Sequence, residues 1–125
     1  MAAVSTIPYL DDVLDPDVAV IALTEAARRL GVPITRVEQM VRDGELLAFK
    51  RQRVPVVPEV FIGGQGRALK GLAATIRVLH DGGYTAEQIM RWLFSTDESL
   101  PGAPVEALHG NRGKEVTRRA QAMAL

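Results

Sequence analysis

The chain has 125 residues, about the length of one domain. Hydrophobic residues make up 47% of it and charged residues 24%, a composition that is typical of globular proteins and excludes wholesale disorder. Its 15 Lys and Arg balance its 15 Asp and Glu, which excludes a strongly basic coat over the whole chain, and the absence of Cys excludes disulfides, thiolate zinc sites and Cys nucleophiles.

An acidic, flexible tail is predicted for residues 1–20. They carry four Asp and no Lys or Arg, contain Pro8 and Pro16, and show neither a helical nor a strand period. Residues 21–53, by contrast, have seven Lys and Arg against four Asp and Glu. Local charge decides what a surface attracts, so this change of sign favours an anionic partner for the basic stretch. Chance clustering on a solvated surface would give the same pattern.

Two short helices joined by a tight turn are predicted next. The first is expected to begin at Thr24, a good N-cap, and to end before Gly31, which can adopt the left-handed conformation of a helix terminus. The second is expected at about 34–43, after Pro33 and before Gly44. Apolar residues at helical spacing predict the buried stripes, namely Leu23, Ala26, Ala27 and Leu30 in the first helix and Val37, Met40 and Val41 in the second.

A short β-hairpin is predicted after the helix pair. Two apolar runs, at 46–49 and 54–58, flank a basic tip at 50–53. Pro55 and Pro58 cannot donate to a ladder, so the second run is expected to be an edge strand. The order of helix, turn, helix and hairpin is typical of a winged helix-turn-helix.

A winged helix-turn-helix is therefore predicted for residues 21–62, followed by a helical extension over residues 63–125 that packs on it. In the extension, Thr85 and Gln88 have the spacing of a capping box. The last helix is expected to begin near Val105 or after Gly113. The predicted fold is mainly α, with a short hairpin as the wing.

The second helix and the hairpin offer side chains suited to DNA. Arg36 and Gln39 can make bidentate contacts with guanine and adenine edges in the major groove, and Thr35 can donate to a phosphate near the helix start. The residues expected to contact DNA are Thr35, Arg36, Gln39, Arg42, Lys50, Arg51, Arg53 and Arg28. Glu38 and Asp43 lie on the same helix and repel DNA, so spacing alone leaves open that the helix pair is only a packing unit.

Residues 23–27 (LTEAA), 30–32 (LGV), Val37 and 42–46 (RDGEL) resemble the helix-turn-helix of excisionase-type and MerR-like regulators. Pro33 departs from the Ser or Thr often found there, and the dimerising coiled coil of MerR-type proteins is absent. The resemblance implies DNA binding.

The second half of the chain resembles the toxin-binding domain of Xre/MbcA/ParS-type antitoxins. The likeness rests on Leu79, Gly83, Tyr84, Trp92 and Leu93, among others. It implies a toxin-like protein as a partner of the C-terminal helices. A protein-interaction module is therefore the alternative to a DNA-binding regulator.

Nearly the whole chain is similar to a small actinobacterial family of winged-helix DNA-binding proteins, one of whose members is targeted by a membrane Ser/Thr kinase. Residues 11–17, 80–84 and 89–94 carry much of this likeness. It implies a transcriptional regulator or nucleoid-associated protein that binds double-stranded DNA. No apolar run approaches the roughly 20 residues of a membrane span, so we expect a cytoplasmic, nucleoid-associated protein without membrane contact.

The same resemblance implies that a Ser/Thr protein kinase phosphorylates the tail. Ser5 and Thr6 are its candidate acceptors, although no local motif marks them. A phosphate would add nearly two negative charges to an acidic segment. Folded over the basic stretch between Arg28 and Arg53, such a tail would compete with DNA.

Signatures of an enzyme or a metal site are missing from the sequence. His80 and His109 are the only histidines. A usual metal site needs three or four ligands, and His80 and Asp81 could form a ligand pair with Glu87, but a histidine at a helix end is the preferred interpretation of His80. A Ser–His–Asp triad would have to combine His109 with Ser95 or Ser99, without a nucleophile-elbow motif. We therefore expect no catalytic residue, metal or cofactor.

Overall fold

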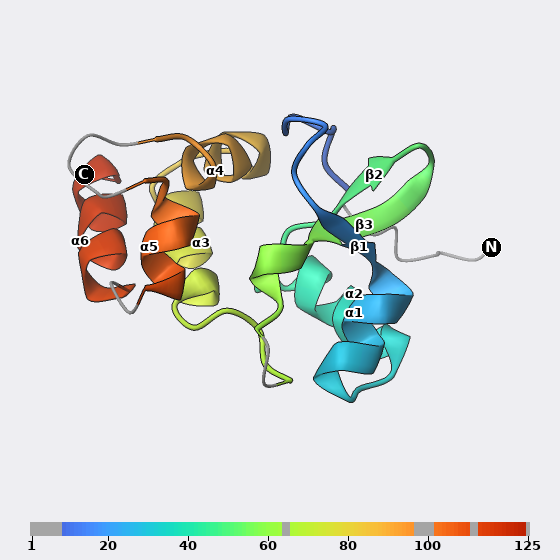
Figure 1. The fold of residues 1–125 in the computed structure, drawn as a ribbon. Helices are drawn as coiled ribbons and strands as arrows, with labels where there is room; N and C mark the ends of the chain where they lie inside the picture. Colours follow the sequence, from blue (N-terminus) through green and yellow to red (C-terminus); the bar gives the residue numbers. More distant parts are fainter. Residues whose placement is uncertain (1–8, 64–65, 97–101, 111–112, 125) are drawn as a thin grey trace.

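The computed structural model describes residues 9–63, 66–96, 102–110 and 113–124. These residues form six α-helices, one short 3-10 helix and a three-stranded antiparallel sheet, so the protein is mainly helical, as the sequence predicts. Figure 1 shows the sheet and the first two helices beside a cluster of the last four helices. None of the described helices is long and apolar enough to cross a membrane.

The first two helices are α1 (Leu23–Leu30) and α2 (Ile34–Arg42). Gly31 ends α1 with a φ of 69°, in the predicted left-handed conformation. The predicted N-cap, Thr24, is wrong: α1 already begins at Leu23, and the N-cap residue, Ala22, has no capping side chain. The reason is that the chain enters α1 directly from a strand that ends at Ala22.

The sheet consists of β1 (Val20–Ala22), β2 (Phe49–Arg51) and β3 (Val54–Pro58), in the order β1-β3-β2. The hairpin of β2 and β3 is the expected wing, and with α1 and α2 it completes a winged helix-turn-helix. The predicted edge position of β3 is wrong, because β1 pairs with its other side and makes it the central strand.

The two prolines of β3 nevertheless follow the physical rule behind that prediction. Pro55 is paired with Lys50 of β2 but lies beyond the end of β1. Pro58 is paired with Val20 of β1 but lies beyond the end of β2. Each proline therefore stands where β3 has a neighbour on one side only, and the missing N–H does not interrupt a two-sided ladder.

The segment before β1 is held against the hairpin from Tyr9 onwards. The Leu10 N–H donates to the Ala48 carbonyl (2.9 Å), and the Arg51 side chain binds Asp12. The sheet includes Val20, so the folded unit begins earlier than residue 21, the expected boundary. Residues 1–8 lie outside the described part of the chain.

Four helices form the C-terminal extension: α3 (Leu72–Asp81), α4 (Ala86–Leu93), α5 (Pro104–His109) and α6 (Gly113–Met123). The capping box of α4 is confirmed: the Gln88 N–H donates to Thr85 Oγ1 (3.1 Å) and the Thr85 N–H donates to Gln88 Oε1 (2.8 Å). The two alternative starts of the last helix turn out to belong to two different helices, α5 and α6.

The extension shares its core with the winged helix through the 3-10 helix η1 (Glu59–Phe61). The rings of Phe61 and Phe94 lie 5.9 Å apart, and the Leu69 N–H donates to the Phe61 carbonyl (2.8 Å). The His109 Nε2–H donates to the Val60 carbonyl (3.0 Å). These contacts fix the end of the wing against α4 and α5.

Candidate nucleic-acid interface

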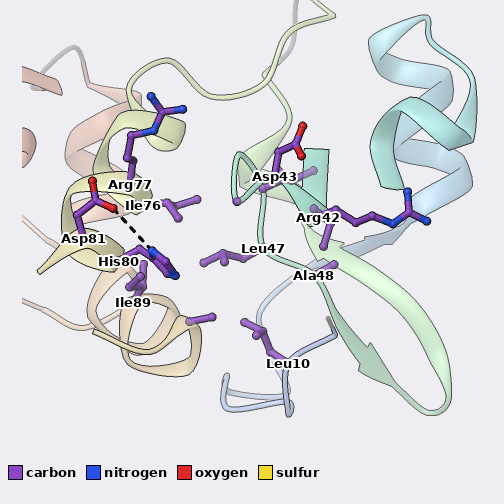
Figure 2. A pocket seen from close by; sticks show the side chains of 14 residues that line it. Leu10, Arg42, Asp43, Leu47, Ala48, Ile76, Arg77, His80, Asp81 and Ile89 are labelled. Atoms are coloured by element: carbon purple, nitrogen blue, oxygen red, sulfur yellow. Dashed lines mark ion pairs between the residues drawn. The ribbon is translucent and has the colours of Figure 1, made fainter. Parts of the chain in front are cut away.

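The outer face of α2 is formed by the residues left outside once Val37 and Val41 are buried. Thr35, Arg36, Gln39 and Arg42, all expected to contact DNA, are exposed on it. An α-helix of this kind fits the major groove of B-DNA. Figure 2 shows that the Arg42 side chain extends away from the helices of the extension.

Ile34, the first residue of α2, was not among the expected contact residues. Its side chain is 38% exposed, which is unusual for a large apolar residue of this protein. It lies three residues before Val37, at the spacing of the buried stripe, so sequence spacing alone does not reveal that it is exposed. An exposed apolar side chain beside the groove can contact the methyl group of thymine.

Two of the expected base-contacting side chains already have acidic partners. The Gln39 side-chain amide donates to Asp43 Oδ1 (2.8 Å), and Arg36 Nη2 lies 3.8 Å from Glu45 Oε1. Exposed pairs of this kind are worth at most about 1 kcal/mol, so a DNA base or phosphate can replace the protein partner. Arg42 makes no ion pair with any residue that the structure describes.

The wing tip is a two-residue turn in an unfavourable backbone conformation. Gln52 and Arg53 connect β2 to β3 with φ values of 51° and 69°. Two positive φ values are the mark of a type I′ turn, which strongly prefers Asn and Gly. Arg53 and Val54 are exposed at this tip, with 47% of Val54 accessible. A charged and an apolar side chain are thus held outward at a cost in backbone strain.

Lys50 and Arg51 lie next to the tip but differ in their surroundings. The Lys50 ammonium group lies 5.4 Å from the centre of the Tyr9 ring and is exposed. Burial raises the pKa of Tyr9, with a further contribution from the charge of Glu38. Tyr9 therefore places the start of the described chain against the hairpin.

Arg51 is occupied by the segment that precedes β1. Its Nε donates to Asp12 Oδ2 (2.9 Å), its Nη2 to Asp12 Oδ1 (3.2 Å) and its Nη1 to the Val18 carbonyl (2.9 Å). Only 19% of the side chain is exposed. The hydrogen bonds from Arg51 lower the pKa of Asp12, and the same contact raises the pKa of Arg51. Arg51 therefore binds the acidic segment that precedes β1 to the wing.

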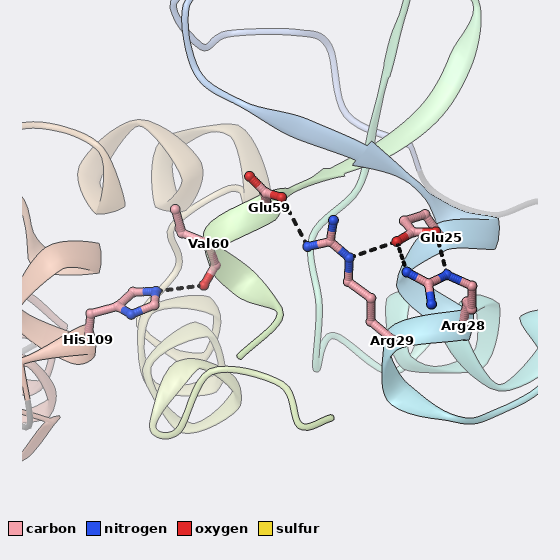
Figure 3. A network of polar contacts seen from close by, with 6 residues as sticks. All are labelled: Glu25, Arg28, Arg29, Glu59, Val60 and His109. Carbon is pink, nitrogen blue, oxygen red and sulfur yellow. Dashed lines mark hydrogen bonds and ion pairs between the residues drawn. The ribbon is translucent and has the colours of Figure 1, made fainter. Parts of the chain in front are cut away.

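Arg28 belongs to a network on α1 that reaches Glu59 at the start of η1 (Figure 3). Arg28 and Arg29 both bind the carboxylate of Glu25, and Arg29 Nη1 lies 3.0 Å from Glu59 Oε2. Hydrogen bonds from Arg28 and Arg29 lower the pKa of Glu25 to about 2. The Arg28 side chain is still 72% exposed, so it remains accessible to a phosphate.

An apolar cleft of about 420 Å³ lies between the C-terminal end of α2 and the helices α3 and α4. The side chains of Leu47 and Ile76 point toward one another across it (Figure 2). His80 Nδ1 and Asp81 Oδ1 are 3.8 Å apart at its edge. Across the described residues, no three His, Cys, Asp or Glu side chains gather closely enough to hold a metal ion.

Other side chains weighed for chemistry have structural contacts. The Ser95 hydroxyl donates to the Arg91 carbonyl (2.6 Å), and His109 binds the Val60 carbonyl rather than a serine. Ser99, Ser5 and Thr6 lie outside the described residues.

Comparison with known proteins identifies both halves of the chain. The wHTH domain of the DNA-binding protein Rv2175c matches residues 6–62, and the Rv2175c C-terminal domain of unknown function matches residues 69–124. The DNA-binding protein Rv2175c of Mycobacterium tuberculosis is 44% identical over 136 residues, which cover 99% of this chain and 93% of the relative. The NMR structure of Rv2175c superposes with a TM-score of 0.84 at 43% identity, covering 100% of this chain and 98% of that one.

Proposed function

This chain belongs to the Rv2175c family of winged-helix DNA-binding proteins, and on that premise we propose that it binds double-stranded DNA as a transcriptional regulator or nucleoid-associated protein. Helix α2 enters the major groove and the hairpin lies along the backbone. The observation that carries the proposal is that the outer face of α2 and the strained wing tip are both exposed.

Each exposed side chain of α2 has a role that suits its chemistry. Arg36 and Gln39 exchange their acidic partners for guanine and adenine edges, and Ile34 contacts a thymine methyl group. Thr35 donates to a phosphate near the helix start, and Arg42 contacts the backbone farther along the groove.

On the hairpin, Lys50 and Arg53 bind phosphates, and Arg28 adds a contact from α1. Arg51 reaches DNA only after its contact with Asp12 opens. While Arg51 is paired with Asp12, it supports DNA binding indirectly, because the ion pair holds the acidic segment against the wing.

Phosphorylation of Ser5 or Thr6 by a Ser/Thr protein kinase weakens DNA binding in this proposal. What supports it is that Tyr9, the first described residue, lies against Lys50 of the hairpin, so the described chain begins beside a residue that is proposed to bind phosphate. The added negative charge repels DNA phosphates. Equal DNA affinity of the Thr6→Glu variant and the parent would contradict this role for Thr6.

The main test is fluorescence anisotropy with a labelled genomic duplex, at about 50 and 200 mM salt. Changing Lys50 and Arg53 together to Ala is expected to weaken binding to all sequences alike and to flatten the salt dependence, whereas Gln39→Ala alters preference among sequences. Arg91→Ala, which removes an exposed cation from α4, serves as the control. Absence of binding by the parent at low salt would refute the proposal.

A toxin-like protein that binds the C-terminal helices remains a prediction from the antitoxin resemblance. It belongs to the alternative function, a protein-interaction module, and is compatible with DNA binding. Co-purification of this chain with a toxin-like protein that is encoded by a co-transcribed gene would support it.

A further inference from the structure

A second basic surface lies on the C-terminal extension, where α3 and α6 begin beside the end of α5. It is a groove of about 760 Å³. Its charged lining residues are Lys70, Lys114 and Arg118, and Thr117 and Gln121 contribute a hydroxyl and an amide. None of these residues belongs to the winged helix.

The fold brings the starts of α3 and α6 together at this groove. Gly71 is the N-cap of α3, with a φ of 85°. A Cβ on Gly71 would come within 3.1 Å of Leu108 of α5 and 3.9 Å of the Cα of Gly113, the first residue of α6. The absence of a side chain at Gly71 therefore allows the two helices to begin side by side. Their N-terminal ends carry partial positive charge, which adds to that of the three cations.

The charges of the groove have one sign. Lys70, Lys114 and Arg118 are exposed and make no ion pair with any described residue. No carboxylate is found among the described residues that line the groove. Glu115 is not among the residues that line the groove; it lines a neighbouring hollow of α6, which it shares with Arg118. Lys and Arg side chains have donors and no acceptors, so the groove suits a ligand that carries acceptors and negative charge.

We infer that this groove is a second binding surface for the phosphate backbone of DNA. The inference rests on the proposed function, because it takes DNA as the polyanion that the protein meets. No aromatic side chain lines the described groove, so it offers no platform on which a base could stack, and its three cations suit a row of phosphates. Its helices and the hairpin lie at opposite ends of the molecule (Figure 1).

The phosphates can come from two sources. A long duplex that passes the wing can continue along the extension, which lengthens the bound site. A second duplex can bind the groove instead, and one chain then bridges two DNA segments. In the first case the groove contacts DNA only when a single duplex is long enough to reach it. In the second case it requires a second duplex molecule.

The test compares the parent with a variant in which Lys70, Lys114 and Arg118 are all changed to Ala. Three phosphate contacts contribute about 2.7 to the slope of log affinity against log salt, which is about 40-fold between 50 and 200 mM salt. Anisotropy with duplexes of about 12 and about 40 base pairs detects a contact along one duplex, since the shorter one spans little more than a helical turn. Capture of a labelled duplex by an immobilised one detects bridging.

A flatter slope of the triple variant on the long duplex alone, or loss of capture alone, supports the inference and identifies the source. Parent-like slopes and parent-like capture in the triple variant overturn it, while the proposed function stands. Absence of DNA binding by the parent overturns the proposed function instead. Arg91→Ala is the matched control for loss of an exposed cation, and circular dichroism verifies that each variant is folded.

Discussion

Replacing Gln52 by Gly at the wing tip is expected to stabilise the protein and to leave DNA binding unchanged. Gln52 holds a φ of 51°. The left-handed conformation costs a non-glycine residue about 1–2 kcal/mol, because Cβ crowds the following carbonyl oxygen. Glycine also raises the conformational entropy of the unfolded chain, which lowers the free energy of unfolding by about 0.4–1 kcal/mol. The midpoints of the two ranges differ by about 0.8 kcal/mol, which is the expected rise in the free energy of unfolding.

Urea unfolding followed by circular dichroism measures this rise, with Gln52→Ala as the control. Alanine retains a Cβ, so the strain stays and no stabilisation is expected. Arg53→Gly relieves the same kind of strain at a φ of 69° but also removes the cation from the tip. It is therefore expected to stabilise the protein while it weakens DNA binding.

Two results would refute this reasoning. Equal stability of Gln52→Gly and Gln52→Ala would mean that the turn stores no strain from its positive φ values. Parent-like DNA affinity of Arg53→Gly would mean that the tip does not contact DNA.

Three further predictions concern other sites. Arg51 lowers the pKa of Asp12 in the folded protein, so their contact stabilises the fold above the ordinary Asp value of 3.8 and is lost as the pH falls through the lowered pKa. In Asp12→Asn, the difference in stability from the parent should shrink on acidification, and a constant difference in pH-dependent unfolding would argue against the contact. Gly31→Ala, at a φ of 69°, should cost about 0.8 kcal/mol in urea unfolding, because restriction of the unfolded chain partly offsets the strain, and a neutral result would show that the α1–α2 turn tolerates a side chain. Ile34→Ala should cost about 1 kcal/mol of stability, because Ile34 is only 38% exposed, and should reduce the preference for thymine-containing sites in a binding selection; an unchanged preference would remove Ile34 from the interface.

Much of the fold could be predicted because its signals are local. Gly31 ends α1 and the Thr85–Gln88 capping box begins α4, each within a few residues of its partner. Helical spacing predicted that Val37 and Val41 lie on the buried face of α2. Ile34 was not assigned to that stripe, and its exposure could be learned only from the structure, because a helix position does not reveal whether a neighbouring element covers it.

The strand β1 was missed for a related reason. It has three residues, and its partners Val56 to Pro58 lie more than thirty residues away in the chain. A strand this short has no periodicity of its own, and only the pairing with β3 defines it. The central position of β3 and the early start of α1 both follow from that pairing.

By itself, the sequence determined the order of helices and hairpin, the caps and turns between them, and the family resemblance that implied DNA binding. Only the tertiary structure decided which cations are available to a ligand: Arg51 is bound by Asp12, whereas Lys70 meets Lys114 and Arg118 in one groove. Helical period, capping and turn propensity act over a few residues, so they can be deduced from neighbouring letters. The partner of a charged side chain depends on segments that are distant in sequence and adjacent only after folding.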